Sequence, residues 1–218
     1  MNFSISEENY IKSISHLQIT HDRVNTTLLA DKINTKAASV TDMLKKLQKK
    51  QLVDYQPYKS FILTDKGLKI ALTIIRKHRL WEFFLVSKLE FKWDEVHEIA
   101  EQLEHINSTE LITRLDVFLD FPSFDPHGDP IPNSKGKMAA IERINLIELP
   151  LKRKGIVSYI QDQSAGMLDL LEHHKICIGS KLKVTRKFDF DGSLEIKMDE
   201  FPAFVLSNIV AKNIYCVL

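Results

Sequence analysis

The sequence is poor in cysteine and has no long apolar run. Its 218 residues include only Cys177 and Cys216, which are too few and too far apart for a disulfide framework or a CxxC metal site. No stretch approaches the roughly 20 apolar residues of a membrane helix, and the N-terminal residues lack the basic-then-apolar pattern of a signal peptide. We therefore expect a cytoplasmic protein with no membrane segment.

Catalytic signatures are also missing. The sequence contains no GxSxG, P-loop or GxGxxG pattern. His97-Glu98 is followed by Glu101 where the HExxH zinc-hydrolase pattern requires a second histidine. We therefore expect no enzyme and no catalytic residues.

Glycine is nearly absent from the first part of the chain. Gly67 is the only glycine before Gly128, whereas six occur from Gly128 onward. This distribution predicts a helical first part and a turn-rich β module in the last. The segment 121–136 between them contains four prolines and two glycines, which is typical of a linker.

The first 70 residues predict a DNA-binding unit. They hold eleven Lys/Arg against seven Asp/Glu, and a basic surface suits a polyanionic partner. A helix capped by Ser6, helices over 27–33 and 36–50, and strands over 52–55 and 61–63 follow the winged helix-turn-helix order, whose second helix enters the major groove. The candidate DNA contacts are Thr27, Lys36, Ala38, Ser39, Thr41, Asp42, Lys46, Tyr58 and Lys59. The alternative is an amphipathic helix whose lysines only keep the surface soluble.

Residues 71–120 are acidic and carry three of the eight histidines. His97, Glu101, Glu104 and His105 lie within about 100° of arc on one predicted helix. His78 and Glu82 are spaced i, i+4 on the helix before it. Imidazole and carboxylate without thiolate favour Mn²⁺ or Fe²⁺, with Zn²⁺ also able to bind. The alternative is that this face is the solvated side of an amphipathic helix.

Several motifs together resemble the diphtheria toxin repressor family (DtxR/MntR type) of metal-dependent transcriptional regulators. They are Arg76-Lys77-His78-Arg79-Leu80, Val96-His97, Glu104-His105 and Asp129-Pro130-Ile131-Pro132. The resemblance covers the whole chain and implies an α+β fold. It implies a winged helix-turn-helix DNA-binding domain (1–73), a helical metal-binding and dimerisation domain with the linker (74–140) and an SH3-like, FeoA-type β-barrel (141–218). It further implies a homodimer that binds a palindromic DNA operator with its metal and represses metal-uptake genes.

The resemblance also implies a regulatory metal site, formed by Asn9, Glu101, Glu104 and His105. Iron-sensing members have Met and Cys at the positions of Asn9 and Glu101, and manganese-sensing members have Asp and Glu. Glu101 therefore favours Mn²⁺ over Fe²⁺, with Zn²⁺ as a surrogate. Asn9 departs from both patterns. Lys12 takes the place of a ligand glutamate in a shorter manganese regulator, so we expect no two-metal cluster.

An ancillary metal site has two forms in the family. One uses the positions of His78, Glu82 and His97, together with side chains of the C-terminal module. The other uses Glu82, a loop like Asp125-Pro126-His127 and an acid of the module, here Asp162, with Gln163 as a weaker alternative. Asp125 replaces a more familiar cysteine, and its loop also fits an ordinary turn. Two functional alternatives stay open: a metal-independent winged-helix protein and a metal-dependent hydrolase.

Overall fold

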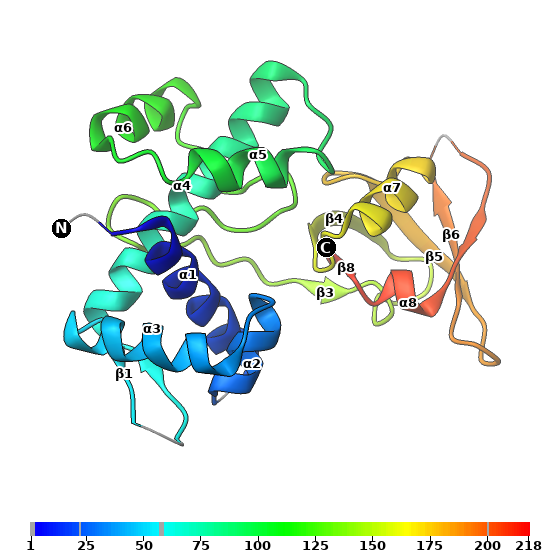
Figure 1. The fold of residues 1–218 in the computed structure, drawn as a ribbon. Coiled ribbons are helices and arrows are strands. Elements are labelled where there is room, and N and C mark those ends of the chain that lie inside the picture. Colours follow the sequence, from blue (N-terminus) through cyan, green and yellow to red (C-terminus); the bar gives the residue numbers. More distant parts are fainter. Residues whose placement is uncertain (1–2, 22, 57–58, 200) are drawn as a thin grey trace. The chain divides into compact units, whose positions relative to one another are not determined.

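The computed structural model describes residues 3–21, 23–56, 59–199 and 201–218, which divide into two compact units (Figure 1). The first unit comprises Met1–His78, Glu101–Thr113 and Pro132–Lys137, and the second comprises Arg79–Ala100, Arg114–Ile131 and Met138–Leu218. Helices α4 (Asp65–Leu89), α5 (Val96–Leu103) and α6 (Thr109–Phe118) contribute residues to both. Neither the 25-residue α4 nor any other helix of the described residues is apolar enough over its length to cross a membrane.

The N-terminal part of the first unit is a winged helix. Helix α1 (Ile5–Thr20) is followed by α2 (Thr26–Lys32), α3 (Ala37–Lys49) and the antiparallel strands β1 (Val53–Asp54) and β2 (Ile62–Leu63). The helix-turn-helix and hairpin order that the sequence predicts is confirmed.

Capping side chains determine where these helices begin. Ser4 caps α1 and forms a capping box with Glu7, in which each side chain accepts a hydrogen bond from the other residue's backbone N–H. The prediction that Ser6 caps this helix was wrong, because Ser4 has a glutamate three residues later and Ser6 has Asn9. Thr64 caps α4, since its Oγ1 accepts a hydrogen bond from the N–H of Gly67 at 3.1 Å.

The core of the winged helix comes from the apolar face of each element. Ile11 and Ile14 of α1 are fully buried, and they pack with buried side chains of the other helices and the hairpin: Leu29, Val40, Leu44, Leu47, Leu52 and Phe61. Fully burying one such side chain stabilises the fold by about 1.5–3 kcal/mol. The 3–4 spacing of Val40, Leu44 and Leu47 therefore fixes which face of α3 stays exposed.

Glu7 also ties α1 to the C-terminal end of α3. Its Oε1 lies 2.5 Å from Lys50 Nζ and 3.2 Å from Lys46 Nζ. Burial alone raises the pKa of Glu7, but the hydrogen bonds from Lys50 and the Ser4 backbone outweigh it and lower the pKa to about 2. Because the folded-state pKa lies below the ordinary value of 4.5, this carboxylate stabilises the fold above that value, and its contribution is lost as the pH falls through about 2.

We expect Glu7→Gln to lower the free energy of unfolding by about 1–3 kcal/mol at neutral pH, since the charge-assisted hydrogen bonds are weakened. The difference from the unchanged protein should shrink as the pH falls from 4.5 towards 2. Urea unfolding at neutral and acidic pH measures this, with exposed Asp31→Asn as the control. An equal loss at both pH values would contradict the assignment.

The C-terminal part of the second unit is a six-stranded antiparallel sheet with two short helices. Its strands are β3 (Ile144–Asn145), β4 (Lys154–Ile160), β5 (Lys181–Lys187), β6 (Leu194–Met198), β7 (Phe204–Leu206) and β8 (Ile214–Val217), in the order β3-β8-β4-β5-β6-β7. Helix α7 (Ala165–His173) follows β4, and α8 (Asn208–Ala211) precedes β8. Alternating residues face the core, as the buried positions Leu194, Ile196 and Met198 of β6 show. With this module, the predicted α+β fold class is confirmed.

Two elements differ from the sequence prediction. Helix α5 is shorter than the predicted helix that carries His97, Glu101, Glu104 and His105, because it ends at Leu103 and the last two of these residues lie in a turn. Strand β8 was missed, although it pairs with both β3 and β4 and buries Ile214 and Cys216. Its four residues are too short to show a clear period of two.

Candidate metal centres and nucleic-acid interface

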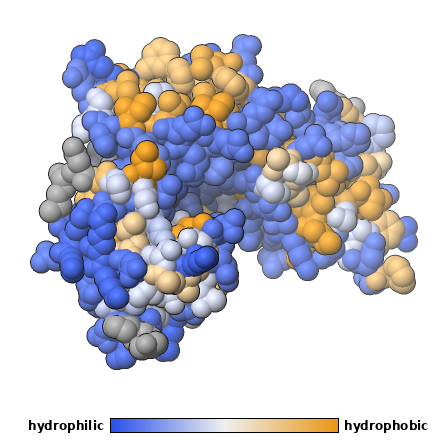
Figure 2. Space-filling view, viewed as in Figure 1, coloured by the Kyte–Doolittle hydropathy of each residue, from blue (hydrophilic) through white to orange (hydrophobic). Residues whose placement is uncertain are grey.

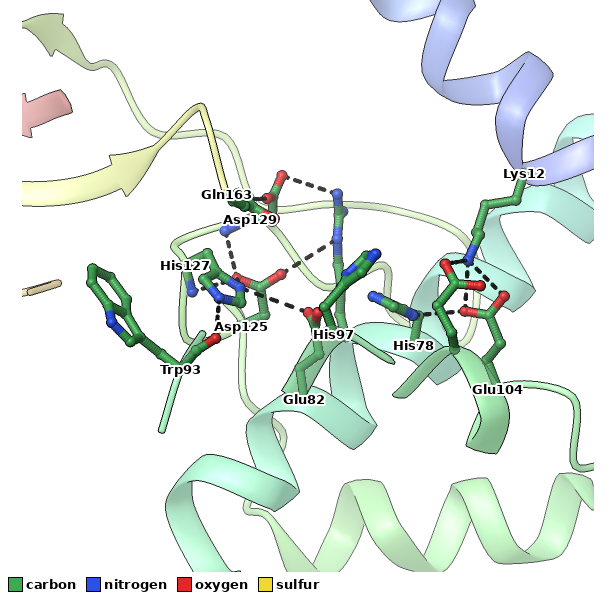
Figure 3. Close-up of polar contacts among 12 residues, drawn as sticks. Lys12, His78, Glu82, Trp93, His97, Glu104, Asp125, His127, Asp129 and Gln163 are labelled. Atoms are coloured by element: carbon green, nitrogen blue, oxygen red, sulfur yellow. Dashed lines mark hydrogen bonds and ion pairs between the residues drawn. The ribbon is translucent and has the colours of Figure 1, made fainter. Parts of the chain in front are cut away.

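A buried polar cluster lies in the first unit, where α1, α4, α5 and the turn after α5 supply its side chains (Figure 3). Glu104 is completely buried, and its Oε2 lies 2.7 Å from His78 Nδ1. Lys12 Nζ donates to both oxygens of Glu104, at 2.7 and 2.9 Å, and to Glu101 Oε1 at 2.5 Å. Although burial raises it, the pKa of Glu104 is lowered overall by the His78 hydrogen bond and the charge of Lys12.

The second imidazole of this cluster is held by a carboxylate of α1. Glu8 Oε2 lies 2.6 Å from His105 Nδ1, and both side chains are largely buried. His105 Nε2 faces Glu104 Oε1 at 3.8 Å. A carboxylate on one ring nitrogen fixes the orientation of the other, which is the usual arrangement behind a metal-binding histidine.

The residues present fit a hard divalent cation. Asn9 Oδ1 is buried and has no hydrogen-bond partner among the residues that the structure describes, and a buried acceptor without a partner is costly. Carboxylate oxygens of Glu101 and Glu104 and a ring nitrogen of His78 lie within 4.8 Å of one another. This set of oxygen and imidazole donors suits Mn²⁺, Fe²⁺ or Zn²⁺.

The structure brings three of the predicted regulatory ligands, Glu101, Glu104 and His105, to one region and adds residues that the sequence analysis did not assign to it. His78, predicted as an ancillary ligand, contacts Glu104 here. The contacts made by Glu8 and Lys12 were not predicted, because they join residues about 90 or more positions apart. Their i, i+4 spacing on α1 was the only local signal.

A second buried cluster lies in the second unit and consists of Glu82, Asp125 and His127 (Figure 3). One ligand atom from each lies within 4.8 Å of the other two. His127 Nε2 is 2.8 Å from the carbonyl oxygen of Trp93, which can only accept a hydrogen bond, so Nε2 carries the proton. His127 Nδ1 is then an acceptor, and it has no hydrogen-bond partner among the described residues. The Nδ1 lone pair of His127 therefore lies near two carboxylates, those of Glu82 and Asp125, and a cation between these three groups would be bound by all of them.

The charges around Asp125 are unbalanced. Burial, Asp129 and Glu82 together raise the pKa of Asp125 well above its ordinary value, and the charge of Arg79 opposes them only partly. Arg79 Nε lies 3.6 Å from Asp125 Oδ2, and one of its terminal nitrogens lies 3.0 Å from Asp129 Oδ1. A cation bound here would stabilise the ionised form of Asp125.

Other ancillary candidates are placed differently. His97 Nδ1 lies 3.3 Å from Glu82 Oε1, and the His97 side chain is 59% exposed. Asp162 is exposed and accepts a hydrogen bond from the Ser164 N–H, so it is not part of the cluster around His127. The neighbouring Gln163 instead reaches this region and donates to Asp129 Oδ2 at 2.6 Å.

The predicted DNA contacts lie mainly on the exposed faces of α2, α3 and the hairpin. Exposed are Thr27, Lys36, Ala38, Ser39, Asp42, Lys46 and Lys59. Thr41 is half-buried and donates to the carbonyl oxygen of Ala37. Lys46 is held by Glu7, which reduces its availability for phosphate. The predicted contact Tyr58 lies outside the described residues.

A hollow of about 780 Å³ adds residues to this surface. It is lined by Arg23, Asn25, Thr26, Thr27, Lys59 and Ser60. The bridge between Val24 and Phe61 brings the two cations Arg23 and Lys59 to one place, which local sequence patterns do not reveal. Cations together with hydroxyl groups are typical of phosphate contacts.

An apolar surface is exposed near the end of α6. Val117, Phe118 and Phe121 are 57–62% exposed, and Figure 2 shows hydrophobic side chains gathered on the face that includes α6. The Phe118 ring lies 6.3 Å from that of Phe84, between centroids. Contiguous exposed aromatic surface marks an interaction site.

Comparison with known protein families matches three consecutive segments. Residues 2–61 match the iron dependent repressor N-terminal DNA binding domain, and residues 64–133 match the iron dependent repressor metal binding and dimerisation domain. Residues 144–218 match the FeoA domain. Together these segments cover nearly the whole chain, in the order that the sequence analysis expects.

Individual proteins agree with the family matches. A solved manganese-dependent transcriptional repressor in complex with manganese is 35% identical, with a TM-score of 0.85, and the match covers 97% of this chain and 99% of that one. The iron-dependent repressor IdeR of Mycobacterium tuberculosis is 27% identical over 177 residues, 77% of each chain. A probable metal transport system membrane protein of Chlamydia trachomatis is 45% identical over 91 residues, which are 42% of this chain but only 20% of that protein.

The family matches and the manganese-bound repressor agree with the winged helix, the helical middle segment and the β module. The chain therefore belongs to the diphtheria toxin repressor family of iron- and manganese-dependent repressors and is a metal-responsive DNA-binding regulator.

Proposed function

We propose that this protein is a homodimeric repressor in the cytoplasm that controls metal uptake. It binds a palindromic operator when Mn²⁺, or less favourably Fe²⁺, occupies the buried polar cluster around Glu101, Glu104 and His105, which we call the regulatory cluster. The observation that carries this proposal is the set of hard donors formed by His78, Glu101 and Glu104, whose ligand atoms lie within 4.8 Å of one another, and the buried amide oxygen of Asn9 on α1 lacks a hydrogen-bond partner among the described residues. Zn²⁺ can act as a surrogate, because the same donors accept it. We propose no enzymatic turnover.

Asn9, Glu101, Glu104 and His105 would hold the regulatory ion, and His78 supports it through Glu104. A divalent ion would supply positive charge that joins side chains of α1, which belongs to the winged helix, to those of α5 and of the turn that follows it. Because a ligand that favours the DNA-competent arrangement strengthens DNA binding, DNA must strengthen metal binding equally.

Glu82, Asp125 and His127 form our proposed ancillary site, to which His97 and Gln163 are adjacent rather than central. The proposed domains are the DNA-binding domain 1–73, the metal-binding and dimerisation domain 74–140 and the FeoA-type domain 141–218. The exposed aromatic surface of Phe118 and Phe121 supports a dimer interface, since isolated domains rarely expose such a patch.

The test is DNA binding of the purified protein to its own upstream DNA, measured by fluorescence anisotropy at fixed salt with Mn²⁺, Fe²⁺ or a chelator. We expect Mn²⁺ to raise the affinity within the roughly 5–150-fold range typical of allosteric coupling. Lys59→Ala should weaken binding and lower the salt slope by about one, as expected for one lost phosphate contact. Lys69→Ala, on the exposed face of α4, is the control. Equal affinity with metal and with chelator would favour the metal-independent alternative.

A further inference from the structure

Lys12 occupies an unusual position for a lysine. It projects from α1 into the regulatory cluster, and its side chain is only 9% exposed. Its ammonium group contacts one oxygen of Glu101 and both oxygens of Glu104, all within 2.9 Å. A buried ammonium is costly unless it is well paired, so this is a buried ion-pair network and not a surface salt bridge.

The net charge of the cluster is balanced better by one divalent ion than by two. The cluster holds three carboxylates, those of Glu8, Glu101 and Glu104, and two buried lysines: Lys12 pairs with Glu101 and Glu104, and the charge of Lys77 interacts with those of Glu8 and Glu104. Adding one divalent ion leaves a single net positive charge, whereas two ions would leave three. Excess like charge at such short range and low exposure is strongly unfavourable.

Lys12 also uses the acceptor sites that a metal needs. The lone pairs of Glu101 and Glu104 that receive its N–H groups are those that would coordinate a cation in the same place. We propose that Lys12 is a built-in cation that competes with the regulatory metal for these two carboxylates and limits the cluster to one divalent ion. This role rests on the proposed metal-responsive function and sets the metal concentration at which the protein responds.

The test replaces Lys12 by methionine, which keeps the length of the side chain and removes its charge. We expect isothermal titration with Mn²⁺ to show binding about tenfold tighter, which corresponds to about 1.4 kcal/mol. Lys69→Met removes an exposed lysine of the same unit and should change the affinity less than about twofold. Repeating each titration with His127→Ala present removes the contribution of the ancillary cluster.

Thermal unfolding separates this role from simple structural support. Without metal, Lys12→Met leaves the carboxylates unbalanced and should unfold at a lower temperature than the unchanged protein. With Mn²⁺ this deficit should largely disappear, so that the variant gains more stability from the ion. An equal deficit with and without Mn²⁺, or unchanged Mn²⁺ affinity, would overturn the proposal. Failure of the unchanged protein to bind Mn²⁺ would instead refute the proposed metal response.

Discussion

Glu104→Gln is expected to abolish the increase in DNA affinity that Mn²⁺ produces. Glu104 is completely buried and is the residue on which Lys12 and His78 both converge. Glutamine keeps the shape but removes the charge that a divalent ion requires. Loss of an outer-shell partner costs about 10–100-fold in metal affinity, and loss of a direct ligand should cost at least as much. Anisotropy with the upstream DNA measures the effect across an Mn²⁺ titration.

The control is Glu98→Gln, which removes the same charge from an exposed position of α5, the helix that ends just before Glu104, and should leave the metal response intact. Binding of Glu104→Gln to DNA in the presence of a chelator should match that of the unchanged protein, because the DNA-facing residues are unaltered. A normal Mn²⁺ response in Glu104→Gln would place the regulatory ion elsewhere.

Gly128→Ala is expected to destabilise the second unit by about 2–4 kcal/mol, because left-handed backbone strain and overpacking add together. Gly128 has a φ of +88°, and a Cβ there would lie 2.1 Å from the carbonyl oxygen of Ser158 in β4. The backbone carbonyls on either side of this contact are engaged as well: that of His127 accepts from Ile160 N–H, and that of Gly128 accepts from Arg143. The substitution should therefore also disturb His127 and weaken metal binding at the ancillary cluster.

Gly179→Ala is a matched control, because Gly179 has the same φ of +88° but open space around its Cβ position. It should show only the cost of left-handed backbone, about 1 kcal/mol. Calorimetry of the two variants measures the difference, and equal effects would mean that the loop can move away from β4 without penalty.

The parts of the fold that the sequence predicts are those governed by local patterns. The 3–4 spacing of apolar residues predicts α3, and the segment 121–136, rich in proline and glycine, predicts a loop. Strand β8 could not be predicted from local patterns, because it is defined by its pairing with β3 and β4. Short elements of this kind depend on tertiary contacts more than on propensity.

Some residues of the candidate metal sites could likewise be predicted from local sequence patterns, and others could not. The helical spacing of Glu101, Glu104 and His105 points to a shared face, and the structure places them in one cluster region. The positions of Asn9 and Asp125 entered only through the family resemblance. The contacts of Lys12 could not be predicted, because a lysine among apolar residues of α1 gives no indication of which distant carboxylates it will meet.

The ion pairs within the regulatory cluster bear on the stability of the protein when no metal is bound. Many small metal-binding domains unfold when a chelator removes their ion, because their ligands have no other partner. Here Lys12 and His78 already satisfy Glu104, and Glu8 already holds His105. We therefore expect metal depletion to leave the protein folded, so that the same molecules can bind the ion again when it returns.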